Sequence, residues 1–390
     1  MSVFNSRVSC VAAACAFFTT SVFAANPTLT NPAISAVLDG YYQSTERPMS
    51  ERIEGFGLGH TELALSANID DMFYGKLTSV IETNAEGTEL GLEEAFIQTL
   101  AMPNGFSIRA GRFLSDIGYL NNQHVHTDAF SDRPGAYRAF LGSHYFDDGV
   151  RFNYVAPTDL YLLLGAEAFK GDSMRAVDEH GERQFKALGV FTAYTKLGGD
   201  IGANGSWQAG LSYLRNENGR LTADEHDHEE LVSETGHDHS HSATFTGENT
   251  YIADFVYKWA PNGNYKYQHL TLSGEYFRVT DFAPLEDDHA AVSVDDMQAW
   301  YVSSVYQFSP NWSAGVRYGE THVQDREGET FHAEKLKETE VSLAWHHSHF
   351  STVRLQYTNQ QGTDHFGIED DNVLTLQYVM TLGAHGAHQF

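Results

Sequence analysis

The chain has 390 residues, of which 52 are acidic and 24 basic, so its formal net charge is −28. This excess of negative charge argues against nucleic acid as a partner and favours cations. Both cysteines lie within the first 24 residues, which leaves the rest of the chain without disulfides. No apolar run approaches the roughly 20 residues of a membrane-spanning helix, so we expect any membrane crossing to be made by strands.

Residues 1–24 have the organisation of an N-terminal export signal. Arg7 supplies the basic n-region, residues 8–18 form the apolar h-region, and Val22-Phe23-Ala24 is a small-x-small cleavage site. We therefore predict a signal peptide followed by one exported domain, 25–390.

Short segments after the signal alternate apolar and polar residues with a period of two, as strands with two different faces do. In 60–69, Leu63 and Leu65 lie on one face while His60 and Glu62 lie on the other. Most segments have about the 9–11 residues that a tilted strand needs to cross a bilayer. The predicted strands are approximately 33–44, 56–69, 72–85, 90–101, 105–114, 147–156, 160–170, 186–196, 206–215, 250–259, 265–280, 295–307, 311–323, 337–347, 350–361 and 372–382.

The connections between these segments sort by parity. Those after even-numbered strands are mostly tight and rich in turn residues, as in Pro157-Thr158-Asp159, whereas those after odd-numbered strands are mostly long and polar, with a short exception at 86–89. Outer-membrane barrels have this asymmetry of short periplasmic turns and long extracellular loops, and a soluble sandwich has no reason for it. The sequence therefore predicts an all-β, transmembrane antiparallel β-barrel of about 16 strands in the outer membrane of a Gram-negative cell.

The third long connection, 115–146, is a candidate to fold inward and narrow the pore. A barrel of about sixteen strands is wide enough to leave an aqueous channel, whose inward side chains set its selectivity. Those side chains could select the solute or pair across the lumen. The predicted pore-lining residues are Arg109, Arg151, Arg317, Arg354, Glu62, Glu167 and Glu275.

Histidines gather in 224–241, within the predicted extracellular loop 216–249. Imidazole nitrogen and carboxylate oxygen together are ligands for zinc and similar divalent ions, and no fixed spacing of a closed zinc site is present. We expect a weak, multi-ion collector, the alternative being a solvated acidic loop. The predicted ligands there are His226, His228, His237, His239, His241, Asp227 and Asp238, and those in the third connection are His124, His126, Asp128 and His144.

Six stretches of the chain resemble a family of Gram-negative outer-membrane proteins described as zinc-regulated porins or receptors. They are LGHTELALSANIDD (58–71), LEEAFIQT (92–99), GFSIRAGRFLSDIGYLNNQHVH (105–126), YRAFLG (137–142), DDGVRFNYVAPTDLY (147–161) and GAHGAHQF (383–390). The resemblance implies a role in zinc or other divalent-cation supply. TonB-dependent receptors have a 22-stranded plugged barrel, and no plug domain precedes the first predicted strand, so we expect a porin.

We thus expect a channel that facilitates divalent-cation uptake, with Zn²⁺ bound or transported, no required cofactor and no enzymatic activity. The expected partners are outer-membrane lipids, divalent ions, a periplasmic metal-binding protein and two further copies in a homotrimer, with no nucleic acid. Three alternatives stay open: a general or anion-selective porin, a surface metal buffer or adhesin, and an outer-membrane hydrolase. The hydrolase would use His144 with Asp147 and Asp148, or Asp287, Asp288 and His289.

Overall fold

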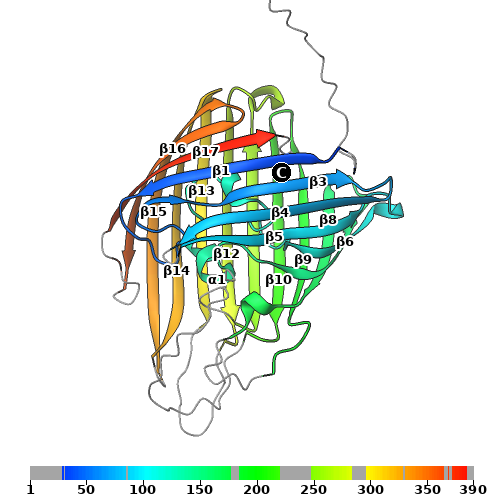
Figure 1. Cartoon of the computed structure of the whole chain (residues 1–390), viewed down its shortest axis with the longest axis horizontal. Helices are drawn as coiled ribbons and strands as arrows, with labels where there is room; N and C mark the ends of the chain where they lie inside the picture. The colour runs from blue at the N-terminus through cyan, green and yellow to red at the C-terminus, as the bar shows by residue number, and fades with distance from the viewer. Residues whose placement is uncertain are drawn as a thin grey trace, which may run out of the picture.

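The computed structural model describes residues 29, 31–84, 87–176, 184–219, 247–282, 296–327, 330–363, 368 and 371–383, and these form one antiparallel sheet that closes on itself (Figure 1). Every predicted strand overlaps one of the observed strands. They are β1 (Ala33–Gln43), β2 (Gly55–Leu58), β3 (Thr61–Asn68), β4 (Phe73–Asn84), β5 (Gly87–Thr99), β6 (Phe106–Leu114), β7 (Phe146–Val155), β8 (Tyr161–Phe169), β9 (Val190–Ile201), β10 (Gly205–Asn216), β11 (Asn249–Trp259), β12 (His269–Thr280), β13 (Met297–Ser309), β14 (Trp312–Glu327), β15 (Thr330–Ser348), β16 (Ser351–Gly362) and β17 (Asn372–Gly383).

The barrel has sixteen wall strands, because β2 and β3 both pair with β1 and lie end to end as one interrupted strand. Pairing of β1 with β17 closes the sheet. The continuous strand predicted over 56–69 is wrong at Gly59 and His60. A Cβ at Gly59 would lie 2.5 Å from Asp39 Oδ2 and 2.6 Å from Arg52 Nη1, so the buried Asp39–Arg52 ion pair occupies the space of a side chain there.

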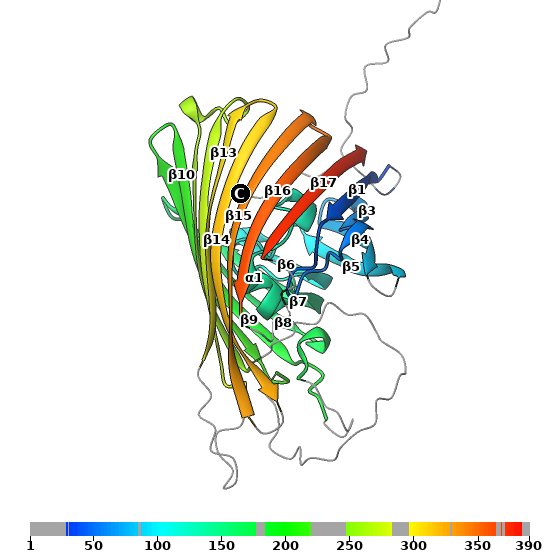
Figure 2. The same ribbon diagram turned by 90° about the vertical axis from the view of Figure 1, so that its left-hand side faces the viewer.

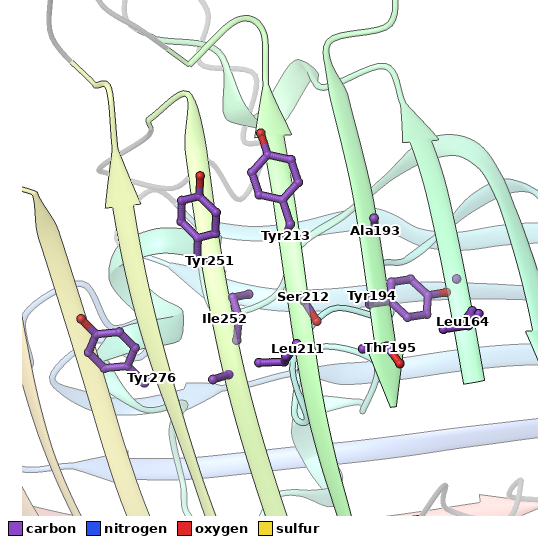
Figure 3. A pocket seen from close by; sticks show the side chains of 12 residues that line it. Leu164, Ala193, Tyr194, Thr195, Leu211, Ser212, Tyr213, Tyr251, Ile252 and Tyr276 are labelled. Atoms are coloured by element: carbon purple, nitrogen blue, oxygen red, sulfur yellow. The ribbon is translucent and has the colours of Figure 1, made fainter. Parts of the chain in front are cut away.

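The wall has apolar residues outside and polar residues inside, the reverse of a soluble protein. On β17, Leu376 and Tyr378 are 48% and 45% exposed, whereas the alternating residues Thr375 and Gln377 are buried. Figure 3 shows the same alternation on β10 and β11, where Leu211 and Tyr251 are exposed beside the buried Ser212 and Ile252. This polarity suits a barrel surrounded by lipid. Among the described residues, no helix is long and apolar enough to cross a membrane.

The segment 115–145 between β6 and β7 lies inside the barrel. It contains η2 (Val125–Thr127) and α1 (Gly135–Leu141), and every residue of α1 is buried. The helix lies against β12, β13 and β14, and the rings of Tyr137 and Phe140 are 5.1 and 6.3 Å from that of Phe277. Figures 1 and 2 both place α1 within the outline of the wall. We call 115–145 the inserted segment.

Glu275 of β12 fixes the start of the inserted segment. Its carboxylate accepts hydrogen bonds from the backbone N–H of Tyr119 and from the hydroxyls of Tyr137 and Tyr301. Gly118 approaches so closely, at a φ of +62°, that a Cβ there would lie 2.5 Å from Glu275 Oε2. A buried carboxylate needs this number of donors to offset its lost hydration.

Buried arginines fix the remainder of the segment. Arg317 of β14 donates to the carbonyl oxygen of Asp132, and Arg354 of β16 donates to that of Asp128. Arg138 of α1 and Arg47 of the β1–β2 connection both pair with Glu338 of β15. Wall charges on three strands therefore hold the inserted segment against the wall.

We expect Phe140→Ala to lower the free energy of unfolding by about 3–5 kcal/mol, because it leaves a cavity between α1 and β12. Urea unfolding of the refolded barrel measures the change. Phe350→Ala, which truncates a side chain that is 52% exposed, should cost far less. Equal losses in the two variants would contradict the packing role of α1.

Glu338→Gln should cost about 3–5 kcal/mol, because it leaves Arg47 and Arg138 buried without that carboxylate. The matched control is Asp148→Asn, which breaks an ion pair with Arg112 whose side chains are 51% and 33% exposed. Exposed pairs contribute about 1 kcal/mol or less. Equal shifts of the unfolding midpoint in the two variants would show that burial of the Glu338 ion pairs does not add to stability.

Candidate functional site

Four histidines and three glutamates meet inside the barrel, where the inserted segment faces β3 and β5. We call them the histidine cluster: His60, Glu62, Glu93, Glu94, His124, His126 and His144. All but His124 are buried, and the His124 side chain is 17% exposed.

The wall side of the cluster depends on two irregularities. His60 lies in the break between β2 and β3, and Glu62 follows on the same inward face because alternate strand residues point the same way. On β5, the pairing with β4 shifts so that Glu94 faces Thr78 and Leu92 faces Ser79, with Glu93 opposite no residue. This β-bulge turns both Glu93 and Glu94 inward, as bulges near functional sites do.

The inserted segment supplies the other histidines. His124 Nδ1 lies 3.2 Å from Glu62 Oε1 and 3.1 Å from Glu93 Oε2. His126 Nδ1 lies 2.6 Å from Glu62 Oε1, and His144 Nε2 lies 3.0 Å from Glu93 Oε1. The cluster is therefore made of imidazole nitrogens that directly face carboxylate oxygens.

The pKa values of His124 and His144 are shifted in opposite directions. Burial alone would lower the pKa of His124, but the carboxylates of Glu62, Glu93 and Glu94 raise it well above its usual range. Burial lowers the pKa of His144 despite its contact with Glu93. The three carboxylates therefore favour positive charge at the position of His124. Among the described residues, His60, Glu62, Glu93 and His124 could hold a metal ion, since one ligand atom from each lies within 4.8 Å of the others.

A cavity of about 800 Å³ lies between the inserted segment and β8–β10. Three carboxylates, those of Asp116, Asp159 and Asp200, line it together with the amine of Lys196. Lys196 Nζ lies 2.5 Å from Asp116 Oδ1, so this amine is already paired. The cavity wall therefore carries more negative charge than positive.

The residues predicted to line the pore are each held by partners inside the barrel. Arg151 pairs with Glu167, whose carboxylate also accepts from the hydroxyls of Ser115 and Thr192. Arg109 donates to Gln98 Oε1 at 2.7 Å and lies over the ring of Phe96. Arg317, Arg354 and Glu275 hold the inserted segment, and Glu62 belongs to the histidine cluster.

The predicted metal ligands fall into three places. His124, His126 and His144 lie in the histidine cluster, whereas Asp128 pairs with Arg133 at 2.8 Å. The seven predicted ligands of 224–241 lie outside the described residues.

The structure does not bring His144, Asp147 and Asp148 to one point. Asp147 accepts from the backbone N–H of Gly171, Asp148 pairs with Arg112, and His144 faces Glu93. The other hydrolase candidates, 287–289, lie outside the described residues.

Sequence reasoning missed His60, Glu93 and Glu94 as site residues. The alternation over 60–69 already placed His60 beside Glu62 on the inward face, so a His-x-Glu pair on one strand face was the available signal. Two adjacent glutamates in a predicted strand show no such signal, because only a bulge puts both on one face.

No family model matches the chain. An uncharacterized protein of Aquifex aeolicus (strain VF5) is 27% identical over 378 residues, a match that covers 92% of this chain and 74% of that protein.

Solved structures of outer-membrane proteins share the fold, each covering 90% of this chain. OmpT of Vibrio cholerae in its trimer form has a TM-score of 0.55 at 10% identity, with 99% of that chain covered. The outer membrane channel DcaP of Acinetobacter baumannii has a TM-score of 0.54 at 14% identity, with 96% of that chain covered. The anion-selective porin of Comamonas acidovorans has a TM-score of 0.53 at 10% identity, with 99% of that chain covered. The chain therefore has the sixteen-stranded barrel fold of outer-membrane porins.

Proposed function

We propose that this protein is a porin-like outer-membrane channel that facilitates the uptake of zinc and other divalent cations. The observation that carries the proposal is the cavity beside the inserted segment, which is lined by the carboxylates of Asp116, Asp159 and Asp200 and by one amine, that of Lys196, which pairs with Asp116. Such a surface attracts cations and repels anions. The porin fold supplies the barrel in which that cavity lies.

The positive charges of the lumen do not oppose this selectivity. Arg151 and Arg317 are buried against Glu167 and Glu340, and Arg354 donates to Gln377 and to carbonyl oxygens of the inserted segment. The carboxylates of Glu167 and Glu340 neutralise Arg151 and Arg317, and Arg354 is only 5% exposed, so these arginines present little charge to a passing anion. The selectivity is then set by the carboxylates of the cavity.

The outer segment 224–241 acts, in this proposal, as a collector that raises the local concentration of divalent ions at the mouth of the channel. Weak binding suits that role, because an ion must also leave. A periplasmic metal-binding protein receives the ions, and three copies assemble in the membrane, as the trimer form of OmpT does. No energy source is required, because enrichment alone raises the rate of entry.

A general or anion-selective porin is the second candidate, favoured by the likeness to the Comamonas acidovorans anion-selective porin. Reversal potentials across a planar bilayer under a KCl gradient distinguish the two. Cation preference supports the proposal, and anion preference overturns it.

Replacing cavity carboxylates should weaken cation preference. We expect Asp159→Asn and Asp200→Asn each to reduce the cation-to-anion permeability ratio by about fivefold or less, which corresponds to about 1 kcal/mol for one charge at close range in water. The measurement is the same reversal potential. Asp71→Asn, at an exposed turn after β3, is the control and should leave the ratio unchanged.

Removing the collector should abolish the effect of zinc at low concentration. We expect micromolar Zn²⁺ to modulate single-channel current through the full chain but not through a variant that lacks 224–241. A conductance equally insensitive to zinc in both proteins would overturn the collector role and leave a general channel.

A further inference from the structure

We propose that His60, Glu62, Glu93 and His124 bind one resident divalent ion of the zinc type, which fastens the inserted segment to the barrel wall. This metal site is separate from the collector segment and from the acidic cavity. It does not depend on the proposed transport function.

The separations of the ligand atoms suit tetrahedral coordination. A tetrahedral ion with bonds of about 2.0–2.1 Å holds its ligand atoms about 3.3 Å apart. His60 Nε2 lies 3.0 Å from Glu93 Oε1 and 3.5 Å from Glu62 Oε1. His124 Nδ1 lies 3.2 Å from Glu62 Oε1 and 3.1 Å from Glu93 Oε2. Glu93 faces the two histidines with different oxygens, and one ligand atom from each of the four residues lies within 4.8 Å of the others, so side-chain adjustment alone can bring the four atoms to tetrahedral spacing.

The chemistry of the four ligands selects the class of ion. Two imidazoles with two carboxylates suit zinc and the neighbouring late transition metals, whereas Mg²⁺ and Ca²⁺ prefer oxygen ligands in larger number. The charge also matches, because two carboxylates neutralise one divalent cation. Of the described residues, only these four form a group of at least three possible ligands at this spacing.

Burial makes this ion a resident and not a passing solute. The side chains of His60, Glu62 and Glu93 are at most 5% exposed, and His124 is 17% exposed. Four protein ligands close the coordination shell, as in structural zinc sites, whereas conduction requires weak binding and ready release.

Neighbouring side chains would orient the carboxylate ligands. His126 contacts Glu62 and His144 contacts Glu93, the kind of outer contact that fixes ligand orientation at metal sites.

Three of the ligands belong to the wall and one belongs to the inserted segment, so the ion cross-links the two. At its other end the segment is held by the packing of α1 on β12–β14, which needs no metal. Loss of the ion should therefore loosen the region around His124 first and leave α1 in place.

The first test counts metal in the purified barrel. The full chain and a variant lacking 224–241 are loaded with Zn²⁺, desalted and analysed by elemental mass spectrometry. We expect the shortened chain to retain one zinc per chain, Glu93→Gln and His124→Ala made in it to retain none, and the control His346→Ala to retain one. No retained zinc in the shortened parent, or retention unchanged in both site variants, overturns the site.

The second test separates a resident ion from a transported one. Co²⁺ in the shortened chain should give the intense visible absorption of tetrahedral coordination, and Zn²⁺ release to a chromophoric chelator should take minutes or longer. Zn²⁺ should also raise the unfolding midpoint of the parent but not that of His124→Ala, with Mg²⁺ as the control ion. Release within the mixing time, or equal stabilisation by Mg²⁺, overturns the resident ion. If the channel proves anion-selective but still retains the zinc, the proposed transport function is wrong and the metal site stands.

Discussion

The buried carboxylates of the wall determine where the inserted segment lies. Glu275 and Glu338 are each at most 5% exposed, and an ionised group at that depth is costly unless donors surround it. The wall strands supply only part of those donors, such as the hydroxyl of Tyr301 to Glu275. Backbone N–H groups and Tyr137 of the inserted segment satisfy Glu275, while Arg47 and Arg138 satisfy Glu338. The interior is thus one polar structure to which wall and segment both contribute.

The same network explains why the lumen is acidic where it is open. Arginines that would give the interior a positive surface are used to hold carbonyl oxygens of the inserted segment, as Arg317 and Arg354 show. Of the carboxylates that line the cavity, Asp116 pairs with Lys196, which leaves Asp159 and Asp200 without a matching amine in the lining. In the proposed cation channel, the arginines that position the segment are buried and do not face the solute.

The regular part of the fold could be predicted from the sequence, since a period of two and the parity of the connections are local signals that tertiary contacts do not override. The irregular part could not. At the break, the Asp39–Arg52 pair lies against Gly59, and the inward turn of Glu93 depends on the pairing register with β4. Neither contact has a local signal in the sequence. His124 was singled out from composition alone, whereas its contact with Glu62 joins residues 62 positions apart, a separation that only the closed barrel brings together.

The bulge at Glu93 has a consequence for how such barrels can diversify. Leu92 already pairs with Ser79 and Glu94 with Thr78, so removing the one unpaired residue would restore a regular ladder between β4 and β5. Every other wall strand would keep its neighbouring strands and the direction in which its side chains point. A single-codon insertion or deletion in one hairpin could therefore create or erase a ligand position while the barrel stays intact. Variation of this kind is invisible to any comparison that scores overall architecture.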